Sequence, residues 1–335
     1  MLVGPGRLPL DHYQLVLANG CIAVAYGNEH DQNMYLGYVK YCRTTGPTPW
    51  KDARGVHYVR LLDSYGPTNV RAHTPWSIYL PHYDSWAPYI PASEVVALLD
   101  PIERAQEIVR SPRDPLEERA LMVLEDLYDS AGIPSSCVGI TGSILPRIHN
   151  PRVSDVDLVV YGHWCSLRVI EAVSEGGTSL GPLSGPMADE WARSNALRLG
   201  ISERLARALY RPWRRGIAHG TLFSITYSDD VPRRLFSQPA RRGLGRVRAE
   251  VSLSGGPRAL SYPTISEIEN YRLVEGHEPP LDVRAVISFE SLFVPALLEG
   301  GRALVEGLLL CGSDDCLILV GGSEHRGFVE PLAMS

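Results

Sequence analysis

One segment, residues 137–162 (CVGITGSILPRIHNPRVSDVDLVVYG), constrains the fold more than any other part of the chain. It predicts a short strand ending at a Gly142–Ser143 turn, and a second, apolar strand that begins around Asp155 and Asp157. Side chains alternate along a strand, so the two aspartates are expected on one face and Val156 on the other. The pattern predicts a pair of carboxylates that faces the Gly-Ser turn.

Two adjacent carboxylates repel each other unless positive charge lies between them. Magnesium satisfies this need because it binds carboxylate oxygens and substrate phosphates together. Nucleotidyl transfer uses one ion to activate a hydroxyl and another to neutralise the triphosphate. We therefore expect Asp155 and Asp157 to bind two Mg²⁺ (or Mn²⁺) ions. Gly142 would let the backbone approach the phosphates, and Ser143 would offer its hydroxyl and N–H at the start of a short helix.

The order of strand, Gly-Ser turn and Asp-x-Asp strand resembles the signature of the DNA polymerase β-like nucleotidyltransferase superfamily. The resemblance covers roughly residues 112–165 and extends loosely to about residue 250. The flanking parts resemble an uncharacterised archaeal group of predicted nucleotidyltransferases. The resemblance implies an α/β (α+β) domain with a mixed sheet. It also implies a third carboxylate, on a neighbouring strand downstream of the pair.

The candidates for that third carboxylate differ in their strand context. The segment GTLFSITYS has no acid within it, and Asp229 and Asp230 follow its end. The segment GRVRAEVSLS contains Glu250, which we predict to be the third catalytic carboxylate and metal ligand. The alternative is a solvated strand acid paired with Arg246 or Arg248. If no third acid approaches the pair, the domain would bind nucleotides without turning them over.

Positive charge is concentrated in residues 204–248, which hold eleven arginines against two acids. This stretch carries +9 and leaves −15 for the rest of the chain, whose total is −6. A basic block within an acidic protein indicates a polyanionic partner, either an NTP or an RNA backbone.

Within this block, the segment YRPWRRG holds the predicted phosphate contacts, Arg211, Arg214 and Arg215. Trp213 and Tyr210 could stack on a base. The alternative is a solvated basic helix face with Trp213 in the core. His149, in the aspartate segment, is a candidate for substrate contact against an ordinary core or surface histidine.

Length and pattern predict three consecutive domains. Residues 1–90 would form an N-terminal β-rich domain, residues 91–250 the nucleotidyltransferase domain, and residues 251–335 a small β-barrel-like domain. The Asn19-Gly20 turn predicts a hairpin. Helices are expected over residues 93–109, broken or kinked at a proline, and over residues 114–132.

Composition narrows the setting. Only Lys40 and Lys51 of the 32 basic residues are lysines, and Asn and Gln are sparse, which favours a hyperthermophilic archaeon. The alternative explanation of the lysine scarcity is a GC-rich genome. The six cysteines form no CxxC pair and are interpreted as buried free thiols, with a Cys311–Cys316 disulfide as the alternative in a hyperthermophile. No apolar run reaches membrane-spanning length, and the first residues lack a signal-peptide pattern, so we expect a cytoplasmic protein without membrane contact.

P-loop, dinucleotide-fingerprint and HExxH patterns are absent from the sequence, which argues against kinases, dehydrogenases and metalloproteases. The predicted function is Mg²⁺-dependent transfer of a nucleoside monophosphate from an NTP to a hydroxyl, on an RNA end or a protein side chain. The alternative is a catalytically degenerate nucleotidyltransferase fold that binds RNA. A third acid within roughly 5 Å of the aspartate pair would favour the enzyme.

Overall fold

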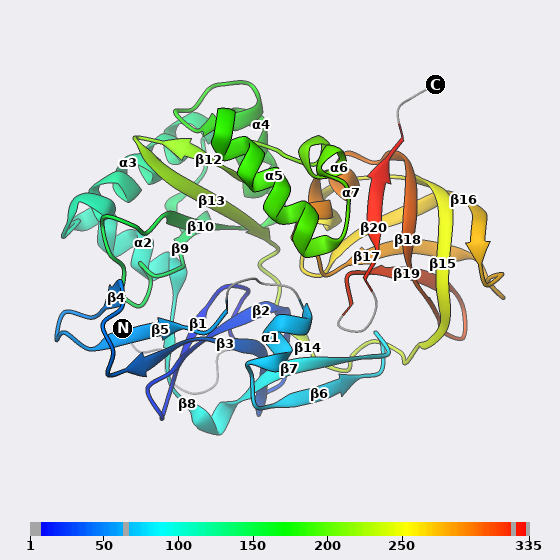
Figure 1. Cartoon of the computed structure of the whole chain (residues 1–335), viewed down its shortest axis with the longest axis horizontal. Coiled ribbons are helices and arrows are strands. Elements are labelled where there is room, and N and C mark those ends of the chain that lie inside the picture. The colour runs from blue at the N-terminus through cyan, green and yellow to red at the C-terminus, as the bar shows by residue number, and fades with distance from the viewer. Residues whose placement is uncertain (1–7, 63–66, 323–325, 333–335) are drawn as a thin grey trace. The chain divides into compact units, whose positions relative to one another are not determined.

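The computed structural model describes residues 8–62, 67–322 and 326–332, and it has a mixed α/β architecture with several sheets (Figure 1). The chain divides into two compact units, each built from three separate segments. Unit 1 comprises Met1–Asp63, Ile90–Ser184 and Arg211–Pro232. Unit 2 comprises Ser64–Tyr89, Gly185–Tyr210 and Arg233–Ser335. Residues 1–7, on which part of the signal-peptide expectation falls, lie outside the described residues.

Unit 1 contains an N-terminal sheet of mostly antiparallel neighbours. Six of its strands follow the order β4-β5-β3-β2-β1-β8. Their bounds are Gln14–Leu17 (β1), Ile22–His30 (β2), Met34–Thr44 (β3), Trp50–Lys51 (β4), His57–Arg60 (β5) and Val95–Leu99 (β8). The predicted hairpin is confirmed, because β1 and β2 pair antiparallel around Gly20, whose φ is 81°. This sheet shares its compact unit with residues 90–184, so it is not separated from them at residue 90 as expected.

The second sheet of unit 1 is mixed and five-stranded, in the order β11-β12-β13-β10-β9. Its strands are Val138–Ile140 (β9), Val156–Tyr161 (β10), Gly181–Pro182 (β11), Arg215–Ala218 (β12) and Thr221–Ser228 (β13). Strand β10 lies between β9 and β13, antiparallel to β9 and parallel to β13. Three helices pack on these strands: Pro101–Arg110 (α2), Pro115–Ala131 (α3) and His163–Ser174 (α4) (Figure 1).

Local chemistry explains where α2 and α3 begin. Asp100 and Asp114 each accept hydrogen bonds from the first-turn N–H groups, and a proline follows each of them. Gly132 ends α3 in the left-handed conformation, as predicted. The helix expected from residue 93 is wrong over its first part: residues 95–99 form β8, and α2 starts only at Pro101.

Unit 2 contains a closed five-stranded barrel. Its strands are Arg242–Leu253 (β15), Thr264–Gly276 (β16), Val283–Ser288 (β17), Gly301–Cys311 (β18) and Cys316–Val320 (β19). The barrel closes because β15 pairs with both β16 and β18, and Phe328–Pro331 (β20) adds to the edge of β18. One pair, β17 with β19, is parallel. The expected domain boundary at residue 250 falls inside β15, so the barrel begins earlier than predicted.

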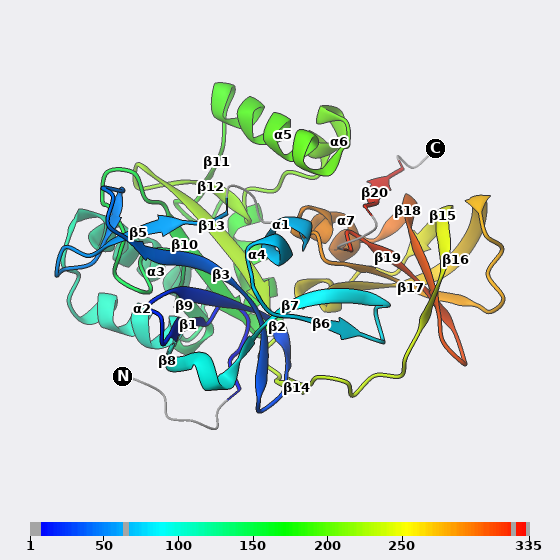
Figure 2. The same cartoon turned by 60° about the horizontal axis from the view of Figure 1, so that its bottom comes forward.

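The remaining elements of the chain are short or helical. Helices α5 (Gly185–Leu199) and α6 (Glu203–Ala208) follow one another in unit 2 and meet through three buried alanines (Figure 2). The others are α1 (Pro67–Ala72), β6 (Ser77–Leu80), β7 (Ser85–Pro91), β14 (Arg233–Arg234), α7 (Val294–Glu299) and short 3-10 turns at Ala92–Glu94, Ser135–Cys137, Pro257–Leu260 and Ser291–Phe293. No helix within the described ranges is long and apolar enough to cross a membrane.

The expectation of free thiols is wrong, because all six cysteines are paired. The disulfides are Cys21–Cys42, Cys137–Cys165 and Cys311–Cys316. The last of these was the alternative raised from the sequence, and it joins register partners across the β18–β19 hairpin. The other two join residues far apart in sequence that pairing and packing bring together.

Candidate functional site

The aspartate pair lies at the start of β10. Asp157 is the second residue of this strand, and Asp155 comes just before its first residue. Val156, Leu158 and Val160 are fully buried, as the alternation of a strand requires for one face. The other face carries Asp157 and then Val159 and Tyr161, which pack against apolar residues of the N-terminal segment, Leu10, Tyr13 and Ala25. The pair therefore belongs to the face that the N-terminal sheet of unit 1 covers.

The carboxylate of Asp157 lies against the Gly-Ser turn, as predicted. A Cβ atom at Gly142 would overlap Asp157 Oδ2, and the backbone N–H of Thr141 donates to the Asp157 carbonyl at 2.9 Å. Ser224 Oγ donates a hydrogen bond to Asp157 Oδ1 from the adjacent strand β13. Asp157 is therefore held between the turn on one side and β13 on the other.

Asp155 has a different partner. Arg215 Nη1 on β12 donates to Asp155 Oδ2 at 2.9 Å, and both side chains are about one-third exposed. Strand register explains this contact: Asp157 is opposite Ser224, and Ser224 is opposite Arg215. The three residues form a row across β10, β13 and β12. Of the predicted phosphate-binding arginines, Arg215 is the one that the described contacts place at the aspartate pair.

The electrostatics of the pair favour the binding of positive charge. Burial, together with the neighbouring charge of Asp155, raises the pKa of Asp157 above its ordinary value. Lys40 of β3, the hydrogen bond from Ser224 and Arg215 act in the opposite direction and lower that pKa. The net shift is upward, so the ionised form of Asp157 is disfavoured in the protein by itself. A cation bound at the pair would offset that cost.

The turn that precedes the pair is shaped by several backbone contacts. Gly142 has a φ of 62°, a left-handed conformation that glycine adopts without steric cost. Buried Gln14 on β1 donates from Nε2 to the Gly142 carbonyl at 2.7 Å. Ser143 is buried, and its hydroxyl donates to Ser154 Oγ at 3.2 Å. Residues 142–147 form turns and no helix, so the expected helix N-terminus at Ser143 is wrong.

We expect Gly142→Ala to lower the free energy of unfolding by about 1–3 kcal/mol, because a Cβ is strained at this φ and collides with Asp157. Gly132→Ala is the matched control, since Gly132 has a φ of 63° and open space around its Cβ position. Urea unfolding of both variants measures the difference. Equal destabilisation by the two substitutions would contradict the tight contact between Gly142 and Asp157.

The third carboxylate is not where the sequence indicated. Glu250 lies on β15 of the barrel sheet, whereas β10 belongs to the five-stranded sheet. Arg272 Nη2 contacts Glu250 Oε1 at 2.5 Å and lowers the pKa of this carboxyl, and Arg302 approaches Oε2 at 3.5 Å. The physical reason is that the chain leaves unit 1 after Pro232, so the next long strand joins another sheet.

The arginine block is dispersed over both units. Four of its arginines make ion pairs within unit 2: Arg204–Glu330, Arg207–Asp189, Arg241–Asp315 and Arg246–Glu306. Arg211 and Arg214 are partly buried in the turn that leads to β12. Trp213 is buried and packs edge-on against Tyr227, so its alternative place in the core is confirmed. The basic helix face of that alternative is wrong, because residues 212–214 form a turn and Arg215 begins β12. The charge count along the sequence thus overstates how much uncompensated positive charge this block presents.

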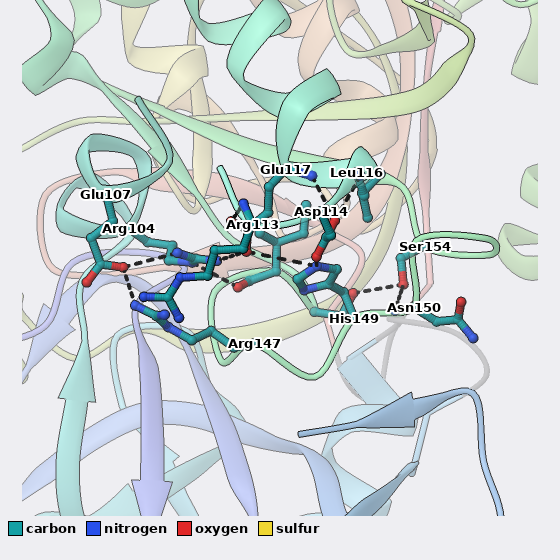
Figure 3. A network of polar contacts seen from close by, with 12 residues as sticks. Arg104, Glu107, Arg113, Asp114, Leu116, Glu117, Arg147, His149, Asn150 and Ser154 are labelled. Carbon is teal, nitrogen blue, oxygen red and sulfur yellow. Dashed lines mark hydrogen bonds and ion pairs between the residues drawn. The ribbon is translucent and has the colours of Figure 1, made fainter. Parts of the chain in front are cut away.

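The loop between the turn and the aspartates is anchored by a polar network (Figure 3). Arg104 Nε on α2 donates to the Ile144 carbonyl at 3.2 Å, and its guanidinium pairs with Glu107 and Glu117. Arg147 of the loop reaches Glu107 at 2.5 Å, and His149 Nε2 lies 2.7 Å from Asp114 Oδ2. The network connects helices α2 and α3 to the loop that carries the Gly-Ser turn.

Asp114, Glu117 and His149 also form a group whose ligand atoms lie within 4.8 Å of one another. Asp114 Oδ1, however, caps α3, and Glu117 Oε1 and Oε2 bind Arg104 and the N–H of Arg113. A metal ion here would compete with a buried guanidinium. We therefore assign this group to anchoring, and His149 with it.

Three residues of the site were not singled out from the sequence: Gln14, Lys40 and Ser224. Features of the sequence could have pointed to Lys40 and Ser224. Lys40 is one of only two lysines in the chain, and Ser224 follows from placing the segment GTLFSITYS beside the aspartate strand. No feature of the sequence points to Gln14, because its contact with Gly142 depends on tertiary packing.

The chain matches no protein-family model, no curated protein and no solved structure. The chemistry of the site must therefore be read from its own residues. They offer two carboxylates beside a guanidinium, a hydroxyl and a glycine turn that packs against the carboxylate of Asp157. Such a set can bind a hard cation and a phosphate group side by side.

Proposed function

We propose that unit 1 is a metal-dependent nucleotidyltransferase that transfers a nucleoside monophosphate from an NTP to a hydroxyl of an RNA end or a protein side chain. The observation that carries the proposal is the contact of Asp157 with the Gly142 turn, with Asp155 beside it. The place of β10 inside a mixed sheet, between β13 and β9, also supports it. These features agree with the Gly-Ser and Asp-x-Asp signature that the sequence resembles.

The donor set fits a divalent cation. Asp155 and Asp157 supply carboxylate oxygens, which Mg²⁺ prefers and readily combines with phosphate oxygens. Burial and the neighbouring charge of Asp155 raise the pKa of Asp157, and a bound cation would offset both. Asp155 and Asp157 would hold the ion, which when bound would activate the attacking hydroxyl and neutralise the triphosphate.

The other residues would bind and orient the nucleotide. Arg215 has five N–H donors in its guanidinium, so it can bind a phosphate oxygen while it contacts Asp155. Gly142 leaves room for the carboxylate of Asp157 beside the turn, and Ser224 fixes that carboxylate by its hydrogen bond. The positive charge of Lys40 acts on Asp157 from the N-terminal sheet.

A second candidate function is nucleotide or RNA binding without turnover. It is favoured by β13, the downstream neighbour of β10, which contains no acid and has Ser224 in register with Asp157, whereas the family resemblance implies an acid on a neighbouring strand. Within the described ranges, no third His, Cys, Asp or Glu joins Asp155 and Asp157 in a potential metal-binding group. Two carboxylates can still bind one ion together with phosphate oxygens, so we retain the enzyme as the first proposal.

The decisive experiment incubates the full-length protein with each labelled NTP, Mg²⁺ or Mn²⁺, and total RNA, and then follows label in RNA and in the protein itself. Transfer that requires the metal and is lost in Asp157→Asn supports the enzyme. Binding of labelled NTP or RNA without transfer supports the second candidate. If neither binding nor transfer occurs with any NTP, both are wrong.

The role of Arg215 gives a separate prediction. Arg215→Gln should weaken NTP binding by about tenfold or more, because a charge-assisted contact to phosphate contributes roughly 1.5–3 kcal/mol. Arg204→Gln is the control, since its exposed ion pair with Glu330 lies in unit 2. Isothermal titration with a non-hydrolysable NTP measures both. Equal NTP affinity of the two variants would show that Arg215 contacts Asp155 but does not bind the nucleotide.

Arg215→Gln, together with a variant in which three arginines are replaced, also tests the hypothesis that the protein binds RNA. Affinity for an RNA backbone should fall by about one log unit per log of salt for each phosphate neutralised. A shallow salt slope together with loss of NTP binding in Arg215→Gln would assign this arginine to the triphosphate. A steep slope that is reduced when Arg211, Arg214 and Arg215 are replaced together would assign the arginines to RNA.

A further inference from the structure

We propose that the aspartate site binds a single divalent cation with its nucleotide, and that Arg215 and Ser224 occupy the place at which a second cation would bind. This inference rests on the proposed function and specifies its metal content. It departs from the two ions expected from the sequence. The observations that carry it are the identities of the two residues that complete the row across the sheet, and the charge that they bring.

The first step concerns ligands. Two ions that act as a pair need carboxylates that can bridge or flank both of them. In the row across β10, β13 and β12, the carboxylate of Asp157 is followed by the hydroxyl of Ser224 and the guanidinium of Arg215. A neutral hydroxyl is a poor Mg²⁺ ligand compared with a carboxylate, and a guanidinium has no acceptor at all. The strand beside the pair thus supplies no anionic ligand at this position.

The second step concerns charge. Two carboxylates and one guanidinium leave one net negative charge at the pair, and Lys40 adds a further positive influence on Asp157. One divalent cation already overcompensates that charge before the triphosphate contributes its own. A second would have to bind near Arg215, which is itself positive and contacts Asp155 at 2.9 Å. Like charges at such separations repel strongly when partly shielded from water.

The third step assigns Arg215 a function in place of the missing ion. A cation near the leaving group would neutralise negative charge on the phosphates, and a fixed guanidinium does the same without a metal site. Arg215 is held on β12 in register with Ser224, so its position is set by the sheet and not by a flexible loop. In this arrangement the Arg215 side chain takes the place of one of the two cations, and a single divalent cation takes the other place.

The test measures bound Mn²⁺ per chain in the full-length protein, with an α,β-methylene NTP of each base, by equilibrium dialysis and electron paramagnetic resonance. After Mn²⁺ bound to nucleotide in solution is subtracted, wild type with its bound nucleotide should hold a total of one Mn²⁺ per chain. The spectrum should show no spin coupling. Two ions about 3.5–4 Å apart would give a spin-coupled spectrum. Two coupled ions that require Asp157 would overturn the single-cation inference and leave the proposed function intact.

Asp157→Asn separates failure of the inference from failure of the proposed function. If wild type binds no Mn²⁺, or if binding is the same in Asp157→Asn, both are overturned, because the aspartates are then not metal ligands. Loss of the single ion in this variant supports both. These results depend only on wild type and one conservative variant.

Ser224→Asp combined with Arg215→Gln restores a third carboxylate and removes the guanidinium. This double variant should bind a second Mn²⁺ and give the coupled spectrum, whereas Arg204→Gln should remain at one. A folded double variant that still binds one ion would overturn the assignment of Arg215 and Ser224. Circular dichroism establishes whether it is folded, and the wild-type stoichiometry decides the inference if it is not.

Discussion

Asp157→Asn should reduce Mg²⁺-dependent NTP turnover by at least about 1,000-fold, because a metal ligand contributes several kcal/mol and each tenfold in rate is about 1.4 kcal/mol. The same substitution should increase the free energy of unfolding at neutral pH. The two effects have one cause, since burial and Asp155 disfavour the charge that the metal requires. Residual turnover within tenfold of wild type would show that Asp157 does not bind the metal.

The pH dependence of this gain has a definite sign. The pKa of Asp157 is raised in the folded protein, so wild type pays for ionising it as pH rises above the ordinary value of about 4. Below that pH the acid is protonated in both states, and the variant should have no advantage. Urea unfolding at pH 3.5 and at pH 8 without metal measures the change. Asp314→Asn is the control for the removal of an exposed carboxylate, because Asp314 lies in the exposed connection between β18 and β19.

Glu117→Ala should produce the largest loss of stability, about 3–5 kcal/mol, because it leaves the guanidinium of Arg104 buried without its main partner. Arg104 is 4% exposed and Glu117 is 2% exposed. Glu118→Ala is the matched control: it removes an exposed acid from the same first turn of α3 and should cost only a few tenths of a kcal/mol. Chemical denaturation distinguishes the two.

Glu117→Gln refines this result. It keeps hydrogen-bonding atoms near Arg104 and the N–H of Arg113 but removes the charge, so its stability should fall between wild type and Glu117→Ala. Because Arg104 also binds the Ile144 carbonyl, NTP binding should weaken along with stability. A Glu117→Ala protein as stable as Glu118→Ala would mean that Arg104 finds water or another partner.

Elements with strong local chemistry could be predicted from the sequence. Helix α3 follows from Asp114, Pro115 and Gly132, and the β1–β2 hairpin from Asn19 and Gly20. The approach of Asp157 to Gly142 also followed from the order of strand, turn and strand. For the helix and the hairpin a few neighbouring residues determine the backbone, and the approach of Asp157 to Gly142 needs only the pairing of two successive strands.

The failures share a dependence on distant residues. Residues 95–99 read as the start of a helix, yet Val95 and its neighbours pair with β1 across about eighty residues of sequence. The strand that holds Glu250 fits either sheet by its pattern, and only the passage of the chain into unit 2 decides. The cysteine pairs Cys21–Cys42 and Cys137–Cys165 likewise require knowledge of which elements are neighbours. Pattern alone contains none of this.

The alternation of the two units along the chain affects how the protein folds while it is synthesised. A ribosome releases β9 and β10 early, but β13, the partner of β10 on its other edge, comes only at Thr221–Ser228, after a segment of unit 2. At about 5–20 residues per second, β10 has an unpaired edge for roughly 3 to 13 seconds, and an unpaired edge is a template for pairing with other chains. Ser224 and Arg215 both belong to Arg211–Pro232, the last segment of unit 1 to be synthesised. Asp155 and Asp157 are therefore synthesised before the Ser224 hydroxyl and the Arg215 guanidinium that contact them.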